Sequence, residues 1–142
     1  MDCTQITPLH WPTDAEIKAA QGAGFRIFRR PDSYFVDKYI KRLVAERPPF
    51  DEARWRHNVE RIRVANKVLP LIVKQYDWPS NAFIPEDPVD VVLQFRFDDL
   101  DFVELTMELE EVFLLPVPPE GPEGFDDMSL GEFMDWLILL GL

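Results

Sequence analysis

The fold that we expect for this 142-residue chain depends on one stretch, Asp98-Asp99-Leu100-Asp101-Phe102-Val103-Glu104-Leu105-Thr106-Met107-Glu108-Leu109-Glu110-Glu111-Val112-Phe113. It mixes acidic and apolar residues in the manner of an amphipathic helix, and it contains neither glycine nor proline. Asp98 is a suitable N-cap, and Asp99 and Asp101 would complement the dipole of the first turn. The stretch predicts one acidic helix over residues 98–113.

Four acids of this helix fall on one face, at spacings of three, four and three residues: Asp101, Glu104, Glu108 and Glu111. Like charges at such spacings destabilise a helix by about 0.2–0.5 kcal/mol per pair. The helix dipole compensates Asp101 in part, but Glu108 and Glu111 lie beyond the first turn. Two interpretations stay open: the face is only solvated, or it docks onto a basic surface of another protein. In the second case the partner-binding residues are Asp98, Asp99, Asp101, Glu104, Glu108 and Glu111.

The same stretch resembles the prosthetic-group helix of the acyl carrier proteins. Asp98, Leu100 and the run from Val103 to Phe113 match the pattern of that helix. In the family, a serine between the aspartate and the leucine carries the phosphopantetheine arm on its hydroxyl. Here that position is Asp99, and a carboxylate offers no hydroxyl for the arm. The resemblance thus implies a carrier-shaped protein that holds no prosthetic cofactor.

The resemblance extends over roughly residues 66–140, about half of the chain. Pro116-Val117-Pro118 resembles the hydrophobic exit from the carrier helix, and residues 127–137 resemble the final helix of the family. The glycine that usually precedes the motif is absent, with Arg96-Phe97 in its place, and the loop at residues 114–127 holds extra proline and glycine. In carrier proteins the equivalent acidic face docks onto Lys and Arg patches of partner enzymes, so the resemblance favours docking here.

Further helices are predicted on both sides of this stretch. Thr13 with Glu16, and Ser129 with Glu132, have the spacing of capping boxes that begin helices. A helix is expected over residues 34–46, before Arg47-Pro48-Pro49. A longer helical pattern runs from residue 51 or 52 to residue 76, with a kink or break expected near Asn66 because Pro70 lies inside it. Residues 25–29 alternate apolar and basic side chains and suggest a short strand or extended arm.

These elements predict a mostly α protein. We expect an acyl-carrier-like small helical bundle over residues 61–142 and a basic, largely helical N-terminal extension over residues 1–60 that packs on it. Trp55 and Trp136 lie on apolar helical faces and are expected in the core, and Trp78 is expected to cover the hydrophobic interior.

The net charge of −11 divides unevenly along the chain. Residues 1–76 hold 14 Lys and Arg against 9 Asp and Glu, whereas residues 77–142 hold one Arg against 17 Asp and Glu. Such an acidic half repels nucleic acid phosphates and attracts basic proteins. The basic residues of the first half could pair with the acids within the chain or across a dimer.

No constellation of residues predicts catalysis or a metal site. The acids at 98, 99 and 101 lack the spacing of a calcium loop, and His10, His57 and the single cysteine, Cys3, form no zinc or nucleophile pattern. There is no apolar run of membrane-spanning length and no visible signal peptide, so we expect a cytoplasmic protein without membrane contact.

The sequence therefore predicts a non-enzymatic protein-binding module without cofactor or metal, whose partner is another protein with a basic surface. Its physical type fits an inhibitor or immunity protein of a basic bacterial toxin. The alternative is a regulator or adaptor in acyl or peptidyl carrier metabolism that binds carrier partner enzymes without a phosphopantetheine arm. The oligomeric state stays open.

Overall fold

The computed structural model describes residues 5–21, 33–56, 59–94 and 100–142. Over these ranges the chain forms helices and no strand, which confirms the mostly α helical bundle. The α-helices are α1 (Asp14–Gln21), α2 (Ser33–Ala45), α3 (Val59–Tyr76), α4 (Val89–Val92), α5 (Leu100–Phe113) and α6 (Leu130–Leu139). Two short 3₁₀ helices, η1 (Glu52–Trp55) and η2 (Phe125–Asp127), lie between them.

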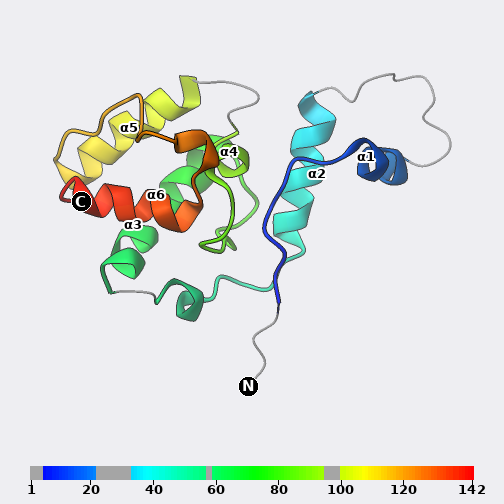
Figure 1. Cartoon of the computed structure of the whole chain (residues 1–142), viewed down its shortest axis with the longest axis horizontal. Helices are drawn as coiled ribbons and strands as arrows, with labels where there is room; N and C mark the ends of the chain where they lie inside the picture. Colours follow the sequence, from blue (N-terminus) through cyan, green and yellow to red (C-terminus); the bar gives the residue numbers. More distant parts are fainter. Residues whose placement is uncertain (1–4, 22–32, 57–58, 95–99) are drawn as a thin grey trace.

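Helix α3 is the centre of the bundle, with α5 and α6 packed against it (Figure 1). Its buried residues recur at helical spacing and belong to one hydrophobic cluster with residues of α5 and α6. The ammonium of Lys67 lies over the Phe113 ring, whereas Gln75 contacts Asp101. Since the later α3 residue meets the earlier α5 residue, the two helices run antiparallel.

The predicted break near Asn66 is wrong, because α3 continues through Pro70 to Tyr76. Pro70 itself is exposed, while the adjacent Leu69 and nearby Ile72 are fully buried. The packing of this buried stripe compensates for the amide donor that proline lacks. The long helical pattern begins later than predicted, since residues 52–55 form η1 and α3 starts at Val59.

Both predicted capping boxes are present. The Thr13 hydroxyl accepts from the Glu16 amide at 3.2 Å, and the Glu16 carboxylate accepts from the Thr13 amide at 2.9 Å. Ser129 and Glu132 make the same reciprocal pair at the start of α6. The expected helix at residues 34–46 is α2, which adds Val36, Ile40 and Val44 to the cluster around α3. The extended segment suggested at residues 25–29 lies outside the described residues.

A buried ion pair joins the end of α2 to the loop before α4. Both guanidinium Nη atoms of Arg47 donate to the Asp87 carboxylate, at 2.7 and 2.8 Å. Asp87 also accepts from the backbone amides of Leu9 and Ile84, each at 2.9 Å. The Asp87 side chain is 0% exposed and that of Arg47 is 6% exposed. These bonds connect the N-terminal segment, α2 and the loop before α4.

A second set of contacts holds the loop before α4 against the start of α6. The amide of Leu130 donates to Asp87 O at 2.7 Å, and that of Gly131 donates to Pro85 O at 2.9 Å. A β-carbon at position 131 would lie 3.0 Å from Pro85 Cβ, so glycine permits this close approach. Trp55 and Trp78 are buried as predicted, whereas Trp136 is only partly buried and stacks on Phe133. Among the described helices none has the length and apolar content needed to cross a bilayer.

Candidate acidic docking surface

One side of helix α5 is buried in the core, and this packing sets the orientation of the helix. Phe102, Leu105 and Leu109 recur at three and four residues and are almost completely buried. The hydroxyl of the buried Thr106 donates to the carbonyl of Val103 at 2.7 Å, which satisfies it within the helix. Because this side is held against the core, the remaining sides of α5 are available to α3 side chains and to solvent.

Three acids of the predicted row, Asp101, Glu104 and Glu108, lie on the side of α5 that borders α3. Gln75 donates to Glu104 at 2.7 Å and to Asp101 at 3.3 Å. Lys74 forms an ion pair with Glu108, with 3.1 Å between Nζ and Oε1. The structure thus brings three of the six predicted residues together beside the C-terminal end of α3.

The other three predicted residues stand apart from this set. Glu111 is exposed at the surface. Asp98 and Asp99 lie outside the described residues, and so does the position that matches the carrier serine. The predicted N-cap of α5 is therefore not among the described contacts.

The chain neutralises this row only in part. Four carboxylates, on Asp101, Glu104, Glu108 and Glu111, have one ammonium, that of Lys74, as an ion-pair partner among the described residues. Lys74 is 74% exposed, so water screens this pair and its contribution is small. The second oxygen of Glu108 is buried and has no hydrogen-bond partner in the described part of the chain. The exposed carboxylates of Glu104 and Glu111 therefore carry the negative charge of the row that is accessible to a ligand.

Apolar side chains are exposed on the same helix, and sequence analysis did not single them out. Met107 is 63% exposed, and Val103 is exposed four residues earlier. Leu114, directly after the helix, is 84% exposed. The signal was present in the sequence, because α5 carries more apolar residues than a single buried stripe can hold. We call Val103, Glu104, Met107, Glu111 and Leu114 the acidic–apolar face.

Leu114 also has an unusual backbone conformation. Its φ angle is +58°, in the left-handed region that branched and bulky residues seldom adopt. Its amide donates to Glu110 O at 2.8 Å, which closes the last turn of α5. Glycine is the usual residue at such a helix end. The chain instead places an exposed leucine there.

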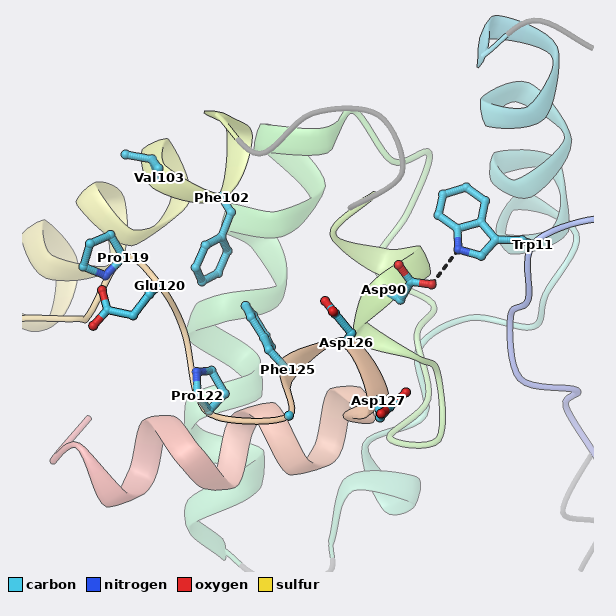
Figure 2. A pocket seen from close by; sticks show the side chains of 11 residues that line it. Trp11, Asp90, Phe102, Val103, Pro119, Glu120, Pro122, Phe125, Asp126 and Asp127 are labelled. Atoms are coloured by element: carbon cyan, nitrogen blue, oxygen red, sulfur yellow. Dashed lines mark hydrogen bonds between the residues drawn. The ribbon is translucent and has the colours of Figure 1, made fainter.

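A groove of about 1070 Å³ begins beside Val103, at the N-terminal part of α5 (Figure 2). Its acidic lining residues are Asp90, Glu120, Asp126 and Asp127, and the described lining includes no Lys, Arg or His. Phe102 and Phe125 meet edge to face at 4.9 Å between ring centroids, and the Trp11 indole donates to Asp90 at 2.7 Å. The groove extends the negative surface beyond α5.

The described part of the chain does not bring together residues for a metal or nucleophile site. No group of three or more His, Cys, Asp or Glu residues among the described residues could hold a metal ion. His10 pairs with Glu16 at 2.9 Å beside α1, while Cys3 and His57 lie outside the described residues.

No protein-family model, no curated protein and no solved structure matches this chain. The acyl-carrier resemblance therefore rests on the residues quoted above.

Proposed function

We propose that this chain is a non-catalytic protein-binding module that docks onto a basic surface of another protein through α5. The observation that carries the proposal is the acidic–apolar face, where exposed carboxylates and exposed apolar side chains occur on one helix. The sequence of α5 contains no Lys, Arg or His. A ligand with complementary charge would meet attraction along the whole helix.

The two kinds of side chain would have different roles in binding. Exposed carboxylates such as Glu104 and Glu111 would increase the association rate of a basic partner and orient it. Apolar side chains such as Met107 would supply affinity, since their burial removes apolar surface from water. A face with both carboxylates and apolar side chains fits protein recognition better than a face that is only solvated, because exposed leucine and methionine gain no stabilisation from contact with water.

The resemblance to acyl carrier proteins supports the same surface. In that family the corresponding helix is the docking helix, and the order of a helix, a long loop, the acidic helix, a second loop and a final helix along the sequence resembles the family pattern. With aspartate at position 99, the docking property would persist without the prosthetic arm. The chain would then occupy a partner's basic patch without bringing an acyl group to it.

Within this proposal, the specific role we favour is an inhibitor or immunity protein that covers a basic surface of a bacterial toxin. The alternative is a regulator or adaptor that binds partner enzymes of acyl or peptidyl carriers. Identification of the captured protein separates the two, because a toxin and a carrier-dependent enzyme differ in activity.

Affinity capture from extracts of the native host tests the proposed function. Glu104→Lys combined with Glu111→Lys reverses two exposed charges on the acidic–apolar face. We expect this variant to lose a basic protein that the unaltered chain retains, by about tenfold or more in yield. Glu52→Lys combined with Glu86→Lys is the matched control, because it makes the same charge change at exposed residues outside α5 and outside the groove.

Circular dichroism checks that both variants keep the helical content of the unaltered chain. Equal retention of the captured protein by the α5 variant and the unaltered chain would refute the proposed surface. Equal loss in both variants would show that net charge, rather than the acidic–apolar face, determines capture.

A further inference from the structure

Leu114 combines an exposed apolar side chain with the left-handed backbone that Asp77 and Gln94 adopt after α3 and α4. Its side chain is 84% exposed, so it contributes little to the core. Its φ of +58° is sterically costly for a leucine and free of cost for a glycine. Strained residues of this kind concentrate at ligand-binding positions, where the surrounding structure holds them for function. The Leu114 side chain is thus accessible to a ligand.

Three of the exposed apolar residues of α5 and its C-terminal end follow one another in a row, whereas Val112 is exposed on another side of the helix. Val103 and Met107 are four residues apart and lie on the same side of α5, and Leu114 directly follows the helix, seven residues after Met107. The row is about 16 Å long at the rise of an α-helix. A straight row of this length on a helix surface matches the apolar stripe of another helix laid along it.

Charge selects the kind of helix that can bind there. Glu104 and Glu111 lie next to the apolar row, and the row of acids continues through Glu108 toward α3. A second copy of this chain would bring the same acids face to face, and an anionic membrane surface would also be repelled. A helix with Lys and Arg beside its apolar stripe would instead find counter-charges at Glu104 and Glu111, about two helical turns apart.

From these observations we propose that the ligand of the acidic–apolar face is a cationic amphipathic helix of another protein, and that Leu114 is its apolar anchor. The inference rests on the proposed function and specifies the partner's structure. The leucine would insert between apolar side chains of the partner helix, while Glu104 and Glu111 pair with its flanking cations. The Leu114 side chain is exposed at the end of α5, where such an insertion can take place.

The test uses the full chain and a synthetic helical peptide about four turns long. The peptide carries leucine at every third or fourth position with lysine beside it, and a scrambled peptide of equal composition spreads both around the helix. Fluorescence anisotropy measures binding of each. We expect the amphipathic peptide to bind at least about tenfold more tightly than the scrambled one.

Leu114→Ala should weaken peptide binding by about tenfold, while Val59→Ala, at an equally exposed apolar position in the first turn of α3, should leave it unchanged. Leu114→Gly should weaken binding similarly and raise the urea midpoint of unfolding, because glycine relieves the strain. A variant that binds less tightly and unfolds less readily cannot be explained by loss of fold.

The outcomes separate the anchor from the docking surface. If Glu104→Lys with Glu111→Lys weakens peptide binding but Leu114→Ala does not, acidic docking stands and the anchor role is refuted. If the scrambled peptide binds as tightly as the amphipathic one, the helical ligand is refuted. If none of these variants changes the binding of a tightly bound peptide, both the anchor and the proposed docking surface are refuted.

Discussion

Single residues separated widely in sequence determine how the parts of this chain are joined. Arg47 and Asp87 are 40 positions apart and form an ion pair with almost no exposed surface. Asp87 accepts four hydrogen bonds, two from the guanidinium and two from backbone amides. A buried carboxylate is tolerated only when its oxygens are satisfied in this way. The pair therefore specifies the arrangement of α2 against the loop before α4.

Removal of either partner should destabilise the fold strongly. Asp87→Ala leaves the Arg47 guanidinium buried without its counter-charge, and we expect a loss of about 3–5 kcal/mol in the free energy of unfolding. Urea denaturation followed by tryptophan fluorescence measures the change. Arg42→Ala is the control, because Arg42 and Glu46 form an exposed pair at 3.9 Å. It should cost about 1 kcal/mol or less. Similar losses in both variants would contradict the structural role of Asp87.

The sequence did not predict these decisive residues. Arg47 was interpreted only as part of a helix stop, and Asp87 was one acid among many, because no local spacing links positions 40 residues apart. Leu114 was likewise not predicted as exposed, since its left-handed backbone is visible only in the structure. The row from Asp101 to Glu111 was predicted from helical spacing, but its contacts with Lys74 and Gln75 depend on helix packing.

At the scale of single elements, the capping boxes were predictable because they depend on residues three positions apart. At the start of α1, hydrogen bonds from the Thr13 backbone amide and from His10 lower the pKa of Glu16 from 4.5 to about 2. The carboxylate form is thus preferred when α1 is folded. Since the folded pKa lies below the unfolded value, this contribution is complete above pH 4.5 and is lost as the pH falls toward 2.

Carbon-detected NMR of the Glu16 side chain measures this directly. We expect its carboxyl group to titrate with a midpoint near 2, and α1 to lose stability as the pH falls below 4.5. Glu16→Gln keeps a hydrogen-bond acceptor at this position but removes the titrating group, so the pH dependence of α1 should disappear in the variant. A Glu16 midpoint close to 4.5 would show that the capping carboxylate is not held as described.

Element boundaries were predicted less well where two principles compete. Pro70 suggested a break in α3, yet the helix is continuous because the neighbouring residues pack in the core. The residues before it suggested a longer helix, yet residues 52–55 form η1 with Asp51 as its N-cap. In both cases tertiary packing overrides the local preference, which a single sequence does not reveal.

At the scale of the whole molecule, folding pairs some basic residues of the first half of the chain with acids of the second half. Arg47 with Asp87, Arg61 with Asp135, and Lys74 with Glu108 each join a basic residue before position 77 to an acid after it. The acids of residues 77–142 greatly outnumber these cations. The excess includes Glu104 and Glu111 on the acidic–apolar face and the acids around the groove in Figure 2. In the proposed function, this excess of acids would attract a basic partner at long range.

Hydrogen–deuterium exchange of the full chain, with and without the protein captured from the host, tests the docking surface most directly. Binding through α5 predicts new protection over residues 103–114, with α1 and α2 unchanged. The Glu104→Lys and Glu111→Lys variant should show no new protection at the same partner concentration. Protection confined to α1 and α2, with residues 103–114 exchanging as in the free chain, would contradict the account.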